Sequence, residues 1–191
     1  MLVACLAACR SAWAVAVIDQ NQPNNAAFLA GFSQPDLAQS FQQTNANIAG
    51  AGIFLQPFVG TPGVVTITLW DALPNAGGNA LASASASGAP GNWVDVFWSP
   101  ISIIPATTYF LVFTSNNSTL GISGDVNPYA NGQAYANAGF QPFPLFDYTF
   151  RTYYDNQFSP QVPEGGWTIA VFAMGLVAVL ILRSRSRQQT A

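Results

Sequence analysis

Histidine is absent from this 191-residue chain, and its five basic residues are all arginines. The only glutamate is Glu164, and cysteine occurs only at Cys5 and Cys9. Residues 15–162 therefore lack histidine, cysteine and lysine, the usual general bases and covalent nucleophiles. A glycosidase would need two opposed carboxyl groups, and no recognisable pair stands out. We therefore expect a protein that is not an enzyme.

Charge is also scarce, at 7% of the residues. Between residues 15 and 162 the single cation, Arg151, stands against the aspartates Asp19, Asp36, Asp71, Asp95, Asp125, Asp147 and Asp155. Such an acidic surface repels phosphate backbones, so we expect no nucleic-acid partner.

The first 14 residues have features of a signal peptide. Residues 1–9 are apolar, and Ala12-Trp13-Ala14 fits a signal-peptidase site, with Ala14-Val15-Ala16 as a second candidate. No basic residue precedes the apolar run, so we expect the natural start to lie upstream. A lipoprotein signal is one alternative, because Leu6-Ala7-Ala8-Cys9 fits a lipobox, and a buried first strand is another. Removal of the segment would leave a mature protein without thiols or disulfides.

Residues 167–182 form an apolar run without the polar stripe of an amphipathic helix, which favours a transmembrane helix over a buried core helix. A basic cluster follows at Arg183, Arg185 and Arg187, before a tail at 188–191. These cations predict a cytoplasmic C-terminus and an N-terminal domain on the outside.

The run is preceded by Val162, Pro163, Glu164, Gly165 and Gly166, after a polar linker at residues 155–161. This motif, the apolar helix and the arginines resemble the tripartite PEP-CTERM sorting signal over residues 162–187. The resemblance implies an exosortase-type processing enzyme as partner. It also implies an inner-membrane intermediate that is then delivered to the cell surface or the medium. A simple helix-entry turn is the alternative.

Residues 15–154 predict an all-β ectodomain of short strands with Gly/Pro turns, most simply a jelly-roll-like β-sandwich. Val65, Ile67 and Leu69 alternate with half-exposed positions, and residues 94–98 and 109–113 show the same period. Small residues alternate over Leu81–Ser87, which we expect to be an edge strand. Further strands are expected around residues 51–55 and 148–152.

Several segments resemble an uncharacterised β-sandwich domain of exported bacterial proteins. They are Asp19-Gln20, Gln39-Ser40-Phe41, Ile48 to Leu55, Gly132-Gln133-Ala134-Tyr135, and Asp147 to Tyr153 in the form Asp-x-x-Phe-Arg-Thr-Tyr. The resemblance implies fold more than activity.

Aromatic side chains are the candidates for sugar stacking, because their faces combine apolar area with polar rims. The candidates are Trp70, Trp93 and Tyr129, followed by Tyr135 and Phe143. The alternative for each is a place in the core.

No cofactor is expected. The alternative is a structural calcium ion at Asp125, Asn127 and Asp147, whose side chains carry oxygen ligands. Turn chemistry explains Asp125 and Asn127 equally well. For Arg151, an internal salt bridge or carbonyl contact is favoured over ligand recognition.

The sequence thus predicts an exported, exosortase-sorted surface protein whose non-catalytic module contacts envelope or exopolysaccharide. The alternative is a self-associating structural protein of the extracellular matrix, which low charge and many uncharged polar residues permit.

Overall fold

The computed structural model describes residues 16–126 and 128–158, which fold into β-strands and one short 3-10 turn without any α-helix. The strands are β1 (Ala16–Gln22), β2 (Ala27–Gly31), β3 (Leu37–Gln42), β4 (Asn47–Phe54), β5 (Gly63–Trp70), β6 (Ala80–Gly88), β7 (Trp93–Ser102), β8 (Thr108–Ser115), β9 (Gly121–Val126), β10 (Ala134–Ala136), β11 (Gln141–Phe143), β12 (Phe146–Tyr148) and β13 (Phe150–Asp155). The 3-10 turn is η1 (Pro74–Ala76), between β5 and β6.

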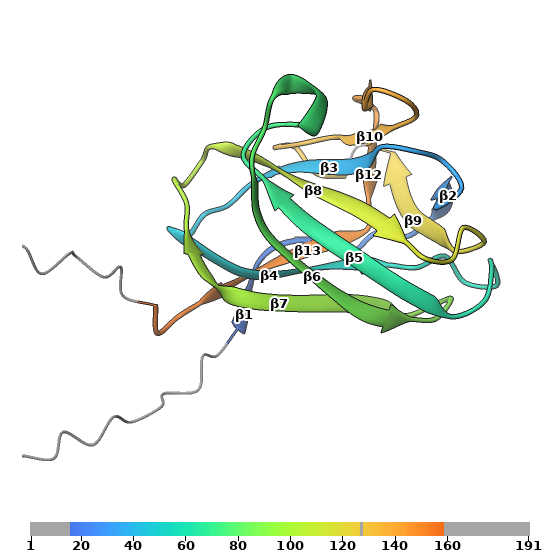
Figure 1. Ribbon diagram of the computed structural model, residues 1–191, viewed down its shortest axis with the longest axis horizontal. Helices are drawn as coiled ribbons and strands as arrows, with labels where there is room; N and C mark the ends of the chain where they lie inside the picture. The colour runs from blue at the N-terminus through green and yellow to red at the C-terminus, as the bar shows by residue number, and fades with distance from the viewer. Residues whose placement is uncertain (1–15, 127, 159–191) are drawn as a thin grey trace, which may run out of the picture. The chain divides into compact units, whose positions relative to one another are not determined.

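The strands form three antiparallel sheets. One has four strands in the order β1-β13-β4-β7, and the second has six in the order β11-β10-β3-β8-β5-β6. The third has three strands in the order β12-β9-β2. In Figure 1, β3 and β8 lie above β4 and β7, so the two larger sheets form the layers of a sandwich-like fold. The all-β, sandwich-like prediction is confirmed.

Alternating residues of the facing strands form the core between these layers. Val65, Ile67 and Leu69 of β5 are fully buried, and the intervening residues are half-buried. Leu111 and Phe113 of β8 follow the same rule. The two-residue alternation in the sequence therefore correctly predicted which of these side chains face the core. The predicted strand at Leu81–Ser87 is also confirmed, because β6 lies at the edge of the six-stranded sheet.

Strand β4 departs from simple alternation, because seven of its eight residues are buried. Gly50 and Gly52 face outward and are covered by side chains from β7. A Cβ atom at Gly50 would lie 2.5 Å from the carbonyl oxygen of Val96, and one at Gly52 would overlap the carboxylate of Asp95. Glycine at these positions therefore lets side chains of β7 lie across the β4 backbone.

Strand β13 includes Asp155, the first residue of the predicted linker. Its backbone N–H donates to Asn47 Oδ1 at 2.8 Å, and Asn47 Nδ2 donates to its carbonyl oxygen at 3.1 Å. Asp155 is buried, so this reciprocal pair fixes the end of the strand against β4.

Candidate functional site

The predicted targeting elements lie outside the described residues. These are the signal peptide, the sorting motif Val162–Gly166, the apolar run 167–182, and the arginines Arg183, Arg185 and Arg187. Within residues 16–126 and 128–158, no helix is long and apolar enough to cross a membrane.

Tyr129 lies inside the sandwich rather than on a binding face. Its side chain is 9% exposed, and its ring packs edge-on against Phe150 with centroids 5.1 Å apart. Its hydroxyl donates to Gln20 Oε1 at 3.0 Å and accepts from the Gln42 N–H at 3.2 Å. Burial raises the pKa of this phenol. These contacts argue against the stacking role predicted for Tyr129.

One face of the Trp93 ring is covered by Arg151. The guanidinium carbon of Arg151 lies 4.0 Å from the centre of the Trp93 ring, and Phe54 meets the ring edge-on at 5.6 Å. A cation–π contact of this kind already uses one face of the indole. That face of Trp93 is therefore not open to a sugar.

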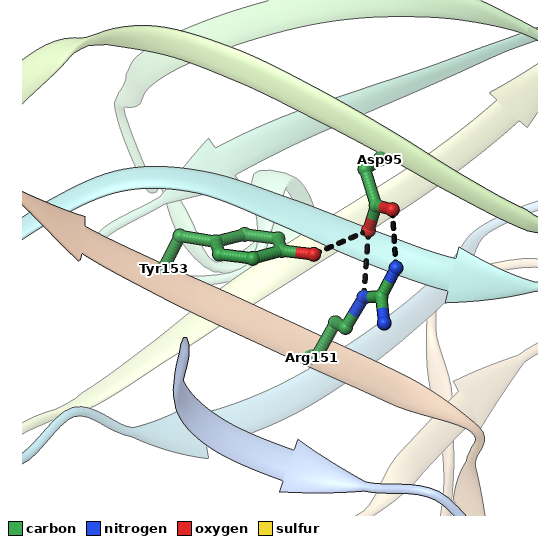
Figure 2. Close-up of polar contacts among 3 residues, drawn as sticks. All are labelled: Asp95, Arg151 and Tyr153. Carbon is green, nitrogen blue, oxygen red and sulfur yellow. Dashed lines mark hydrogen bonds and ion pairs between the residues drawn. The ribbon is translucent and has the colours of Figure 1, made fainter. Parts of the chain in front are cut away.

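Arg151 forms the internal salt bridge that the sequence favoured. Its Nε donates to Asp95 Oδ1 at 2.8 Å, and a second guanidinium nitrogen contacts Oδ2 (Figure 2). The hydroxyl of Tyr153 donates to the same Oδ1 at 2.8 Å. Burial and the Asp95 carboxylate together raise the pKa of Tyr153. The cation and its carboxylate therefore satisfy one another.

Trp70 and Tyr135 belong to one aromatic strip on the outer face of the six-stranded sheet. Trp70 stands opposite Phe110 in the ladder between β5 and β8, and the rings of Phe110 and Tyr135 are 5.8 Å apart. Among the described residues, Trp70 Nε1 is buried and has no hydrogen-bond partner. Asn75, in the loop after Trp70, donates from Nδ2 to the Gly139 carbonyl at 2.8 Å. This bond ties the loop to the turn after β10.

Phe143, the remaining aromatic candidate, lies at the rim of a pocket of about 290 Å³. The pocket lies between the β10–β11 hairpin and strands β2 and β12. Its lining consists of apolar, aromatic and amide side chains, namely Leu29, Gln34, Ala134, Ala136, Asn137, Phe143, Phe146 and Tyr148. None of these carries a charge, so the pocket suits a neutral molecule with both apolar faces and hydrogen-bonding groups.

The two amides give the pocket its polar character. Gln34 uses its Oε1 to accept the Gly31 N–H at 3.1 Å, which leaves its Nε2 donors for another partner. Asn137 adopts a left-handed backbone conformation with φ of 65° just after β10. Asparagine tolerates this conformation better than most residues, and its amide supplies both a donor and an acceptor at the pocket.

A buried polar network fixes the floor of the pocket. The Tyr148 hydroxyl donates to the Tyr135 carbonyl at 3.1 Å, and the Tyr148 N–H donates to Gln39 Oε1 at 2.9 Å. Gln39 Nε2 in turn donates to Asp147 Oδ1 at 2.7 Å, and Asp147 Oδ2 accepts the Tyr129 N–H at 3.1 Å. Burial raises the pKa of the Tyr148 phenol and that of the Asp147 carboxyl. The network holds the Tyr148 ring in one position.

The predicted calcium ligands are placed as follows. Asp125 and Asp147 stand opposite one another in the ladder between β9 and β12, whereas Asn127 lies outside the described residues. Both oxygens of Asp147 accept internal hydrogen bonds, and Asp125 accepts one from the adjacent Val126 N–H. In the part of the chain described, no group of three or more His, Cys, Asp or Glu residues could hold a metal ion. Calcium binding stays a prediction.

Residues of the segments that resemble an exported β-sandwich domain form hydrogen bonds that hold the fold together. Asp19 accepts hydrogen bonds from the backbone N–H groups of Thr44 and Asn45 at 3.0 and 2.7 Å. Ser40 and Gln133 bond through side chain and backbone, with the Gln133 N–H donating to Ser40 Oγ at 2.9 Å. These contacts fasten β1 and β10 to their neighbours.

The comparisons with family models, with curated proteins and with solved structures found no match to this chain.

Sequence reasoning named Phe143 but missed the rest of the pocket. Phe146 and Tyr148 lie close to Phe143 in the chain, and this local density of aromatic residues was the available signal. Gln34 and Asn137 join them only through the pairing of β10 with β3 and β11, which no local pattern reveals.

Proposed function

We propose that this chain is an exported cell-surface protein whose β-sandwich module binds neutral polysaccharide without catalysing a reaction. The observation that carries the proposal is the uncharged pocket, which combines the aromatic walls Phe143, Phe146 and Tyr148 with the amides of Gln34 and Asn137.

Neutral sugars match this lining in two respects. Their C–H faces pack against aromatic rings, and their hydroxyls exchange hydrogen bonds with amides. An acidic sugar would bring a carboxylate into a pocket that offers no cation, because the ectodomain's Arg151 is already paired with Asp95. The volume of about 290 Å³ is at the small end for ligand sites, which suits a chain end or a short stretch of sugar.

A binding role is favoured over hydrolysis because the pocket lining lacks the carboxyl groups that hydrolysis requires. Glycoside hydrolysis uses two carboxyl groups on either side of the scissile bond. The lining holds no carboxyl group, and the nearby Asp147 directs both oxygens into internal hydrogen bonds. The side chains at the pocket can therefore hold a sugar but supply no acid or base.

Delivery to the surface is proposed from the sequence. The signal peptide would start export, and a transmembrane helix at residues 167–182 would hold an inner-membrane intermediate with its C-terminus in the cytoplasm. An exosortase-type enzyme would then process the PEP-CTERM-like region and release a jelly-roll-like module to the surface or the medium. The Pro163–Glu164 pair before an apolar run and the three arginines support this route.

Affinity electrophoresis of the full-length protein in gels containing polysaccharide tests the binding proposal. Neutral glucans, galactans and mannans should retard the protein, and uronic-acid polymers should not. Phe143→Ala should weaken retardation about twofold to tenfold, because one stacking ring is worth about 0.5–1.5 kcal/mol. Phe58→Ala is the control, because Phe58 is a fully exposed phenylalanine in the loop between β4 and β5.

Absence of retardation by every neutral polymer would overturn the proposal. Equal losses for Phe143→Ala and Phe58→Ala would also contradict it, since binding would then not involve the pocket.

A further inference from the structure

Strand β6 is a long sheet edge that is regular from Ala82 to Gly88, with one break in register at its start, opposite Leu69 and Trp70. It has nine residues, Ala-Leu-Ala-Ser-Ala-Ser-Ala-Ser-Gly, and among the described strands it forms a hydrogen-bonded ladder only with β5. β7 follows β6 through a short turn and lies close to the end of β6, but its hydrogen-bonded ladder is formed with β4. One side of the β6 backbone thus has donors and acceptors available to another strand.

The remaining edges of the larger sheets carry features that discourage pairing. β1 contains Asp19 and a break in register, and β7 contains Asp95 and Pro100. β11 has three residues, one of them Pro142. Charges, prolines, irregularities and short length all block edge-to-edge association. Among these edges, β6 alone is long, uncharged and free of proline.

From Ala82 to Ser87 the outer face of β6 is regular and lined with hydroxyls. Ser85 Oγ lies 2.7 Å from Thr66 Oγ1, and Ser83 Oγ lies 2.9 Å from Thr68 Oγ1, so each serine is hydrogen-bonded to β5. The other side chains of the strand are mostly alanines that pack against the core. No bulky or charged group would keep a second strand at a distance.

We propose that β6 is a self-association edge that pairs antiparallel with β6 of a second copy of this chain. The strand is self-complementary, because a two-fold axis at Ala84 sets Ser83 opposite Ser85 of the other copy and Ala82 opposite Ala86. Such an isologous contact joins two six-stranded sheets into one continuous sheet.

This association is independent of polysaccharide binding and compatible with it. The pocket is lined by β10 and β11, at the opposite end of the strand order from β6. A dimer formed through β6 would therefore present two open pockets, and a polysaccharide with repeated sites could engage both.

The test compares the full-length chain with two charge variants in the same non-denaturing detergent. Sedimentation should show a concentration-dependent dimer for the wild type. Ser85→Lys should abolish it by placing a charge at the edge. Thr114→Lys should leave it intact, because Thr114 is exposed on the same face of the same sheet but lies on the interior strand β8. Circular dichroism confirms that all variants are folded.

A mixture tests the register. Ser83→Glu and Ser85→Lys chains should each be monomeric alone and should form a heterodimer when mixed, because the introduced charges then face each other. Amide hydrogen exchange over residues 80–88 should slow as the wild-type concentration rises. A wild type that stays monomeric, or a Ser85→Lys variant that dimerises like Thr114→Lys, would overturn the proposal.

Discussion

Asp95 and Arg151 form an ion pair across the backbone of Gly52, bridging β7 and β13 over the intervening strand β4 (Figure 2). The guanidinium also covers Trp93, and Tyr153 donates its hydroxyl to Asp95. These contacts shield the outer face of the four-stranded sheet, so Arg151, the single cation of residues 16–158, has a structural role.

We predict that Asp95→Asn lowers the free energy of unfolding by about 1–3 kcal/mol, because it removes the charge that orients Arg151 and leaves the guanidinium poorly paired. Denaturant unfolding of the full-length protein measures the change. Asp125→Asn is the matched control, because Asp125 accepts its hydrogen bond from the adjacent Val126 N–H. Equal effects of the two substitutions would mean that the ion pair contributes no particular stability.

We predict that Gly52→Ala also destabilises the fold by about 1–3 kcal/mol, because the added methyl group overlaps the Asp95 carboxylate. In an Asp95→Ala background the same change should cost less, which a double-mutant cycle would detect. Gly31→Ala is the control, since its nearest neighbour is the Ser33 hydroxyl at 3.2 Å. Strict additivity of Gly52→Ala and Asp95→Ala would contradict the steric explanation.

The sequence predicted those parts of the fold that depend on local alternation. The buried residues of β5 and the edge position of Leu81–Ser87 could be read directly, because a strand with one buried face has a period of two. The pairing of Arg151 could be anticipated, but its partner Asp95 could not, since 56 positions separate them and sheet order decides the contact.

Dependence on contacts between distant segments also explains why the sequence did not predict which aromatic candidates are buried. Tyr129 lies outside the regular strands, where no period distinguishes buried from exposed positions, and its burial depends on contacts with Gln20 and Gln42. The pocket combines residues from positions 29 to 148. Only the folded arrangement brings these residues together.

Asp19 provides a pH-dependent contribution to stability. Burial alone would raise its pKa, but hydrogen bonds from Thr44, Asn45 and Gln20 outweigh this effect and lower the pKa below the ordinary 3.8. As the pH falls below 3.8, the Asp19 carboxyl group is protonated in the unfolded chain before it is protonated in the folded protein. The stability that Asp19 contributes is therefore present above pH 3.8 and is lost as the pH falls through the folded-state pKa.

We therefore predict that Asp19→Asn lowers stability by about 1–2 kcal/mol at pH 7 and flattens the acid limb of the stability curve. Urea unfolding at a series of pH values between 7 and 2 measures both effects. Identical acid limbs for the variant and the wild type would show that other carboxyl groups determine the slope.

We predict that Gln39→Leu destabilises the protein by about 2–4 kcal/mol, because it leaves the buried Asp147 and the Tyr148 N–H without their shared partner. The pKa of Asp147 should rise further, since the Gln39 hydrogen bond lowers it. A folded-state pKa raised in this way makes stability fall as the pH increases toward it.

Carbon-13 NMR of the Asp147 carboxyl and denaturant unfolding measure the two effects. Gln42→Leu, the same change on the same strand, is the control and should cost about 0.5 kcal/mol or less, because the Gln42 side chain bonds to Thr108 at an exposed position. An unchanged Asp147 titration in Gln39→Leu would contradict the proposed coupling.

Processing at the C-terminus distinguishes a sorting signal from a simple membrane anchor. An anchor requires only an apolar run, so Pro163→Ala with Glu164→Ala should not alter it. A sorting enzyme requires an accessible extended peptide, and proline disfavours helix at the residue before it. We predict that the double substitution traps the full-length protein in the inner membrane of a host with an exosortase.

Intact-mass analysis of the inner-membrane and surface fractions provides the measurement. Wild-type protein at the surface should lack residues 167–191, and a control with Pro160→Ala and Gln161→Ala in the predicted linker should be processed like it. The control is matched because it also replaces one proline and one polar residue close to the motif. If the wild type retains the apolar run at the surface, or if the Pro163/Glu164 variant is trimmed equally well, the segment acts only as a tether.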